Sequence, residues 1–130
     1  MKILLDTCAI IWAISSADQL SKKARRILSD IHAEVSVSSI SCAEIACAVA
    51  NKKIVLDKHW KLWFRQHTNT NRWEIFPIDL PVIEEAFSLP GDFHRDPADR
   101  IIVATARLYQ ATLLTADHKI LNYPHVETIW

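Results

Sequence analysis

The sequence predicts an α/β fold, with a parallel sheet covered by helices on both faces. Short apolar or β-branched segments alternate along the chain with segments whose apolar residues recur at helical spacing. This alternation is typical of strand–helix–strand units, which build parallel sheets. Five strands are expected, at residues 2–6, 35–40, 73–78, 111–115 and 126–130. No repeat, linker or low-complexity segment interrupts the 130 residues, so we expect one domain over residues 1–130.

The first part of the chain is expected to form two strands and three helices. Residues 2–6, KILLD, are an apolar run ending in an acid, which is typical of a buried parallel strand. A helix follows through Ile14, and apolar residues at helical spacing predict another over residues 21–31. Residues 35–40, VSVSSI, alternate and contain β-branched side chains, which favours a strand. The next helix is expected over residues 41–50.

The middle of the chain is expected to form two helices around the third strand. Asp57 is a candidate cap for a helix with an aromatic face. Residues 73–78, WEIFPI, predict the strand. A helix over residues 81–89 then begins with Pro81, a residue that is favoured in the first helical turn.

The last part of the chain repeats the same alternation. Asp96-Pro97 is expected to start a long helix that ends near Tyr109. Residues 111–115, ATLLT, predict the fourth strand, and Asp117 is expected to cap a short helix. Residues 126–130, VETIW, predict the fifth strand, which closes the sheet.

The composition excludes several classes of protein. No apolar run approaches the roughly 18 residues of a membrane span, so no membrane association is expected. The only glycine is Gly91, which excludes the glycine-rich loops of P-loop and dinucleotide-binding proteins. Cys8, Cys42 and Cys47 are odd in number and lack zinc-knuckle spacing, so a cytoplasmic, reducing location is expected. Zero net charge argues against a non-specific nucleic-acid binder, but leaves room for an enzyme that holds a short RNA segment.

Acidic residues stand near the starts of helices that leave the same predicted edge of the sheet. They are Asp6, Glu44, Asp96, Asp99 and Asp117. Open α/β sheets bind their ligands at the carboxyl ends of the strands. Carboxylates crowded there repel one another, and Mg²⁺ or Mn²⁺, which prefers oxygen ligands, relieves that repulsion. The sequence therefore predicts a divalent-metal site suited to phosphodiester hydrolysis.

Each of these acids also has a purely structural interpretation. Asp6 and Asp117 suit ordinary N-caps. Ser41 and Glu44 have the spacing of a capping box, and Asp96 with Asp99 has the same spacing. Helix N-termini favour negative charge in any protein, because of the helix dipole. Only the gathering of all the acids at one edge favours the metal site.

Three segments also resemble a known family. Residues 94–117, HRDPADRIIVATARLYQATLLTAD, closely resemble the signature block of PIN-domain ribonucleases, in particular the VapC-type toxins of bacterial toxin–antitoxin pairs. LLDTCAIIW at residues 4–12 and VSSISCAEIA at residues 37–46 resemble the stretches that carry the family's first two acids. The resemblance covers nearly the whole chain in the same order. It implies a three-layer α/β/α fold with a five-stranded parallel sheet, and RNA cleavage with Mg²⁺ or Mn²⁺.

The resemblance also implies roles for individual residues. The catalytic, metal-binding acids fall on Asp6, Glu44, Asp99 and Asp117. Asp96 matches a further acid that either binds metal or only caps the helix. Thr115 matches a hydroxyl residue that supports the last acid. Arg100 and His94 flank the site, where each contacts the substrate or braces the acids. Hydrolysis is expected to proceed by direct attack of water on phosphorus, without a covalent intermediate.

The family resemblance further implies a homodimer and an inhibiting antitoxin protein. Trp60, Trp63, Phe64 and His67 recur at the spacing of one helix face. This aromatic face suits either the core or a groove that binds an antitoxin helix or a dimer partner. Ile11 and Trp12 permit the same two interpretations.

Two other functions compete with a nuclease. A catalytically silent module with this fold could bind a partner only, although its acids would then serve no purpose beyond capping. A metal-dependent phosphatase or phosphotransfer domain is also α/β with acids at strand ends. However, a phosphatase of the haloacid-dehalogenase type needs DxD where this chain has Asp6-Thr7-Cys8, and Asp79 is the sole candidate phosphoacceptor of a receiver.

Overall fold

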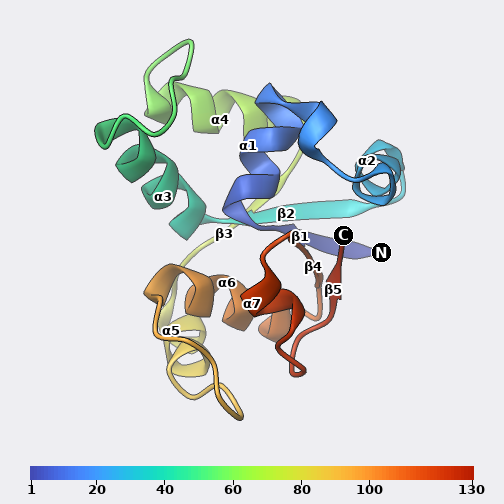
Figure 1. The fold of residues 1–130 in the computed structure, drawn as a ribbon, viewed down its shortest axis with the longest axis vertical. Coiled ribbons are helices and arrows are strands. Elements are labelled where there is room, and N and C mark those ends of the chain that lie inside the picture. The colour runs from blue at the N-terminus through green and yellow to red at the C-terminus, as the bar shows by residue number, and fades with distance from the viewer.

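A five-stranded parallel sheet forms the centre of the computed structural model, which describes residues 1–130 (Figure 1). The strands are β1 (Lys2–Leu5), β2 (Glu34–Ser38), β3 (Glu74–Phe76), β4 (Thr112–Leu114) and β5 (Thr128–Ile129). Their order across the sheet is β3-β2-β1-β4-β5, and every neighbouring pair is parallel. The predicted five-stranded parallel sheet is therefore confirmed.

Helices cover both faces of this sheet. They are α1 (Thr7–Ser15), α2 (Lys22–Ser29), α3 (Ser39–Ala50), α4 (Trp60–Thr70), α5 (Leu80–Ala86), α6 (Pro97–Leu108) and α7 (His118–Leu121), with a 3₁₀ turn η1 at Ala17–Gln19. Figure 1 shows α1, α2 and α4 on one side of the sheet, and α5, α6 and α7 on the other. The predicted three-layer α/β/α architecture is thus present.

The central strand β1 shows why two helical layers form. Successive strand residues point to opposite faces of a sheet. Ile3 and Leu5 pack into the core shared with α1, α2, α3 and α4, whereas Leu4 packs with α6 and α7 on the other face. All three side chains are fully buried. An uninterrupted apolar run is therefore what a strand with both faces covered requires.

The aromatic residues of α4 divide between the core and its margin. Trp63 and Phe64 are buried in the cluster around Ile3 and Leu5, with exposed fractions of 2% and 4%. Trp60 is only partly buried and packs at the edge of the same cluster. The partner-binding prediction is consequently wrong for Trp63 and Phe64, because burying them on the sheet removes them from any external partner.

Several predicted boundaries differ from the observed ones. Helix α3 begins at Ser39 and is capped by Ser38, three residues before the predicted Ser41. His59, through its Nδ1 atom, caps α4, so the prediction of Asp57 as the cap is wrong. The last strand has only two residues, where five were expected.

Three helices end in the same way without the glycine that usually stands there. The first residue past the C-cap has positive φ after α3, α4 and α6, at Lys52 (φ 57°), Arg72 (φ 58°) and Gln110 (φ 53°). After α6, Gln110 N–H donates to Arg107 O and Ala111 N–H to Ala106 O, which is the Schellman arrangement. The chain thus places ordinary side chains in a backbone conformation that favours glycine.

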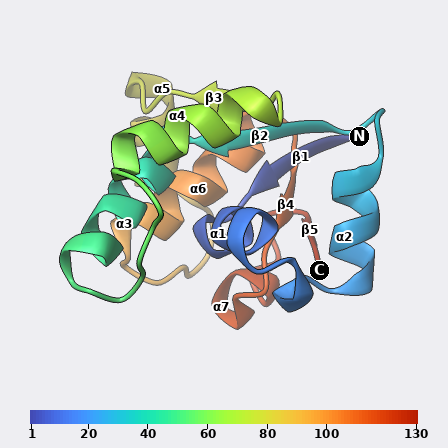
Figure 2. The same cartoon turned by 90° about the horizontal axis from the view of Figure 1, so that it is seen from above.

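The strands also fix where the acids must lie. Because β1 and β4 are parallel neighbours in register from Ile3 opposite Thr112 to Leu5 opposite Leu114, both end at the same edge. The amide of Asp6 continues the ladder by donating to Leu114 O at 3.1 Å. Figures 1 and 2 show α2 beside the amino end of β1 and α3 at the opposite, carboxyl end. No helix in this chain has both the length and the apolar character needed to cross a membrane.

Candidate functional site

A cleft of about 950 Å³ opens at the carboxyl edge of the sheet. All five acids singled out in the sequence line it: Asp6, Glu44, Asp96, Asp99 and Asp117. Asp6 and Asp117 follow β1 and β4, Glu44 lies in the second turn of α3, and Asp96 and Asp99 lie at the N-terminus of α6. The fold therefore brings together residues that are spread over most of the chain.

Asp6 lies deepest, directly after β1, and is 8% exposed. Its Oδ1 accepts a hydrogen bond from the Thr7 amide at 2.7 Å, which makes it the N-cap of α1. Its Oδ2 accepts a second hydrogen bond from the Thr115 hydroxyl, also at 2.7 Å. Burial raises the pKa of the Asp6 carboxyl, and these two hydrogen bonds offset part of that rise.

Thr115 links the two acids at the strand ends. Its buried hydroxyl donates to Asp6 and accepts from the backbone amide of Asp117 at 3.1 Å. Asp117 in turn caps α7, because its Oδ1 accepts from the Lys119 amide at 2.8 Å. Thr115 therefore contacts the backbone of the last acid and the carboxylate of the first.

Glu44 is held by the hydroxyl group of Thr7, a residue to which the sequence assigned no role. The Thr7 hydroxyl donates to Glu44 Oε1 at 2.5 Å and lies 2.8 Å from the hydroxyl of Ser41. The predicted capping box of Ser41 and Glu44 is wrong, because α3 starts earlier and Ser41 faces Thr7 instead. Burial raises the pKa of Glu44, and the hydrogen bond from Thr7 partly offsets this.

Asp96 and Asp99 occupy the N-terminus of α6. Asp96 caps the helix by accepting from the Asp99 amide at 3.1 Å, as its capping interpretation predicted. The Asp99 side chain accepts no aligned hydrogen bond. Burial, followed by repulsion from Asp96 and the other cleft acids, raises the pKa of Asp99 to about 7. Burial and repulsion thus both favour the protonated form of Asp99 when no cation is present.

Arg100 faces away from the cleft. Its guanidinium group donates three hydrogen bonds, to the backbone oxygens of His94 (2.9 Å), Ala86 (3.0 Å) and Phe93 (2.8 Å). His94 places its Nε2 atom 3.1 Å from Oδ2 of Asp99. Of the two roles expected for these residues, bracing is the one that the contacts of Arg100 favour.

Comparison with protein families decides the identity of the fold. The family model described as "PIN domain" matches residues 3–126. The chain belongs to the PIN-domain family. Ribonuclease VapC22 of Mycobacterium tuberculosis is 31% identical over 134 residues, with 98% of each chain covered. The predicted relationship to PIN-domain proteins of the VapC type is confirmed.

Solved structures agree with this PIN fold. VapBC2 from Rickettsia felis, bound to a DNA fragment from the promoter, matches with a TM-score of 0.74 at 19% identity, covering 100% of this chain and 99% of the other. FitAcB from Neisseria gonorrhoeae matches with a TM-score of 0.67 at 23% identity, covering 98% and 96%. A toxin–antitoxin complex from Klebsiella pneumoniae gives 0.68 at 22% identity, covering 98% and 96%.

The donor set of this PIN domain suits a hard divalent cation. Every acid in the cleft offers carboxylate oxygen, the ligand that Mg²⁺ and Mn²⁺ prefer. The pKa of Asp99 is raised first by burial and then by repulsion from the neighbouring acids, and a cation would relieve that repulsion. No three His, Cys, Asp or Glu side chains are arranged to hold one ion together. The carboxylates of Asp6, Glu44, Asp96 and Asp117 instead accept from backbone amides and hydroxyls. Mg²⁺ commonly keeps several waters and contacts only one or two carboxylates, so this arrangement fits.

The cleft of the PIN domain has a second, less polar part. Ile11 and Trp12 of α1 line it, as do Ile54 and Lys53 in the loop between α3 and α4. Trp12 is partly buried and packs against Trp130, with ring centroids 5.7 Å apart. Of the aromatic and apolar side chains considered for partner binding, Ile11 and Trp12 are thus the ones that border the acids.

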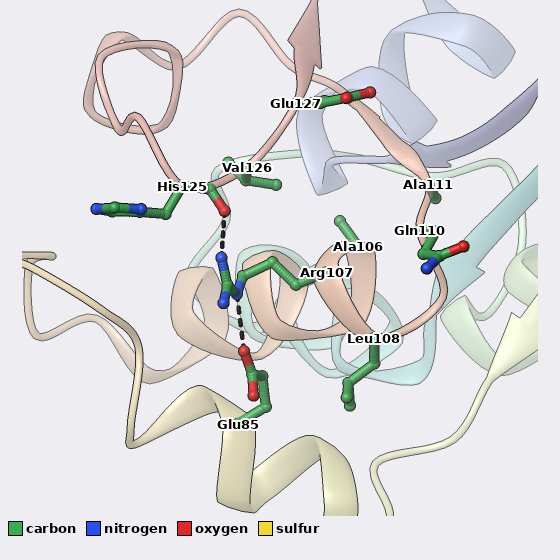
Figure 3. Close-up of a pocket in the computed structure, with 9 residues that line it drawn as sticks. All are labelled: Glu85, Ala106, Arg107, Leu108, Gln110, Ala111, His125, Val126 and Glu127. Atoms are coloured by element: carbon green, nitrogen blue, oxygen red, sulfur yellow. Dashed lines mark hydrogen bonds and ion pairs between the residues drawn. The ribbon is translucent and has the colours of Figure 1, made fainter.

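A smaller cavity of about 490 Å³ lies at the other end of α6 (Figure 3). There Arg107 donates to Glu85 Oε1 at 2.7 Å and to the backbone oxygen of His125 at 2.5 Å. These bonds join α5, α6 and the segment before β5. Arg107 and Asp99 are eight residues apart on one helix, or about 12 Å, so this cavity is separate from the acidic cleft.

Proposed function

We propose that this chain is a Mg²⁺- or Mn²⁺-dependent endoribonuclease that acts as the toxin of a toxin–antitoxin pair. The observation that carries the proposal is the convergence of Asp6, Glu44, Asp99 and Asp117 in one cleft, where the pKa of Asp99 is raised to about 7. The similarity to a VapC ribonuclease over almost the full length of both chains supports the same assignment.

The cleft residues would have different roles in phosphodiester hydrolysis. Asp6 and Asp99 would hold the cation, with Glu44 and Asp117 completing its surroundings and Asp96 available beside them. A bound divalent cation supplies Lewis-acid stabilisation of charge on the phosphate and favours deprotonation of the attacking water. Glu44 and Asp117 would hold the waters that surround the cation, one of which would attack phosphorus in line. Thr115 and Thr7 keep Asp6 and Glu44 in position through the hydrogen bonds described above.

RNA cleavage by purified protein tests this proposal. We expect wild-type protein with Mn²⁺ to cut total cellular RNA into discrete products, and EDTA to abolish them. Asp6→Asn and Asp99→Asn should remove activity while the fold remains. Asp79→Asn is a matched control, because Asp79 caps α5 outside the cleft by accepting from the Val82 amide. Equal activity of all four proteins would refute the nuclease assignment.

The similar structures support an antitoxin as a partner of this chain. Several structural neighbours are toxin–antitoxin complexes, and we propose that an antitoxin silences this chain in the reducing cytosol, where its three free cysteines would stay reduced. The part of the cleft lined by Ile11 and Trp12 is the surface we assign to it, since a protein seated there would also close access to the acids. We further propose a homodimer, which light scattering on the purified chain would detect.

A further inference from the structure

Hydrogen bonds from Arg100 hold the loop between α5 and α6 beside the acidic cleft. Arg100 reaches back from α6 and donates to backbone oxygens at Ala86, Phe93 and His94, near both ends of this loop. Its guanidinium carbon also lies 6.0 Å from the ring centroid of Phe93 and from that of Phe87. Three of the five N–H donors of Arg100 are thus used by main-chain oxygens, one from each guanidinium nitrogen, which fixes the loop in place.

The segment just after α7 holds the same loop through Tyr123. The buried Tyr123 donates its hydroxyl to the backbone oxygen of Pro90 at 2.5 Å. Its ring packs edge-on against Phe93, with centroids 4.8 Å apart, and the Phe93 ring lies against that of His94 at a tilt of 33°, with centroids 4.4 Å apart. His94 is therefore held at its backbone oxygen by Arg100 and at its ring by Phe93.

The orientation of His94 places its Nε2 atom beside the carboxylate of Asp99. Its Nδ1 faces the amide of Asp96 at 3.4 Å and accepts from it, which leaves the proton on Nε2. The Nε2 atom is shielded from solvent and makes no aligned hydrogen bond. Oδ2 of Asp99 lies 3.1 Å from it, close enough for attraction but off the line of the N–H bond.

Asp99 lacks the support that the other cleft acids have. Asp6 accepts from Thr7 and Thr115, and Glu44 accepts from Thr7. Asp96 and Asp117 accept from helix amides. No hydroxyl or amide donates to the Asp99 carboxylate, so His94 Nε2–H is the donor that this carboxylate has at hand.

We propose that His94 is a positioning residue for Asp99, and that Arg100 sets the position of His94. The Nε2–H group holds one carboxylate oxygen of Asp99 so that the other is directed at the cation, which is the role that donors behind metal ligands commonly perform. This inference rests on the metal site proposed above. It assigns Arg100 no contact with RNA.

Titration of the metal-free protein with Mn²⁺, followed by calorimetry, tests the inference without relying on activity. His94→Phe keeps a ring to stack on Phe93 but removes the donor, and we expect Mn²⁺ to bind about tenfold more weakly. His94→Gln restores an N–H near the Nε2 position and should recover most of the affinity. His32→Phe is the matched control, because His32 is exposed in the turn before β2, away from the cleft.

Three further readouts separate positioning from simple support of the fold. The melting temperature of metal-free His94→Phe should stay close to that of wild type, since Nε2 has no aligned partner to lose and the bond that Nδ1 accepts from the Asp96 amide is long, at 3.4 Å, and exposed. In RNA cleavage, kcat should drop while KM stays within about twofold, because substrate contacts are untouched. Arg100→Lys, which cannot reach three carbonyls, should weaken Mn²⁺ binding in the same direction as His94→Phe.

The outcomes distinguish failure of this inference from failure of the proposed function. If wild type binds no Mn²⁺, the proposed metal-dependent function is refuted, and so is this inference. If wild type binds Mn²⁺ and His94→Phe binds it equally well, only the positioning role is refuted. Equal weakening by Phe and Gln, or loss of affinity that follows loss of metal-free stability in both variants, would also overturn it.

Discussion

Thr115 donates a hydrogen bond to Asp6, 109 residues earlier in the chain, at 2.7 Å. The same hydroxyl accepts from the amide of Asp117, so a single oxygen ties the ends of β1 and β4 to each other. Both strand ends thereby share one buried polar link beneath the acidic cleft. The link gives Asp6 a donor at a place where burial disfavours its charged form.

Removing this hydroxyl should weaken the protein and its site together. Thr115→Val keeps the volume of the side chain but leaves Oδ2 of Asp6 and the amide of Asp117 without their partner. Leaving buried polar groups unpaired costs about 1–3 kcal/mol, which we expect as a loss in the free energy of unfolding. Urea denaturation in EDTA measures it. Thr115→Ser keeps the hydroxyl, and a loss as large as that of the valine variant would contradict the argument.

The stability of the metal-free protein should decline as pH rises through the neutral range. The pKa of Asp99 is about 7 in the folded chain, against 3.8 for the unperturbed group. Between these values the folded state binds more protons than the unfolded state, so the free energy of unfolding falls with increasing pH. Asp6 and Glu44 shift in the same direction. Because the Asp99 side chain is partly exposed, we expect about 1–2 kcal/mol of loss between about pH 5 and about pH 8.

Asp99→Asn provides the control for this pH dependence. It removes the titrating group and most of the repulsion, so its unfolding free energy should change less over the same range. Saturating Mn²⁺ should also flatten the profile of the wild type, because a cation favours the ionised carboxylates. An unchanged slope in the asparagine variant would assign the effect to other groups.

Adjacent residues of α4 distinguish core packing from partner binding. Trp63 is 2% exposed and Leu62 is 63% exposed. Trp63→Ala should lower the free energy of unfolding by about 3–5 kcal/mol, because it removes a large side chain from the core and leaves a cavity. Leu62→Ala should stay within about 0.5 kcal/mol of wild type. Similar small effects from both variants in chemical denaturation would show that Trp63 is not part of the core.

Glycine at the end of α6 should stabilise the chain. Gln110 has φ 53° and an exposed side chain, so Gln110→Gly relieves backbone strain without losing packing. We expect a gain of about 0.5–1 kcal/mol in the free energy of unfolding. Gln110→Ala keeps the Cβ atom and should give no gain. A melting temperature for the glycine variant at or below that of the alanine variant would argue against strain at this position.

The sequence allowed the sheet, the two helical layers and the five cleft acids to be predicted, because each depends on a local signal. The apolar run of β1 and the acid that follows it are readable without knowing the partner strands. Thr7 and Ser41 were missed since their hydroxyls meet only when α1 packs beside α3. Trp63 could not be assigned either, because an aromatic helix face suits a core and a groove equally well.

The predicted starts of α3 and α4 were wrong because neighbouring residues can each cap a helix. Ser38 and Ser41 are both good caps, and the burial of β2 decides that Ser38 is used. Asp57 is a better intrinsic cap than His59, yet α4 begins where Trp60 reaches the margin of the core. Tertiary packing overrides local preference at both positions, as it does for the two-residue strand at the end of the chain.

The double use of Asp96 and Asp117, as helix caps and as cleft acids, has an evolutionary consequence. Asparagine caps a helix as well as aspartate does, and one nucleotide separates their codons. A single mutation can therefore remove a negative charge from the cleft while the helix it caps still forms. Lineages of this fold can lose their chemistry abruptly and keep a well-folded chain, available for selection on binding alone.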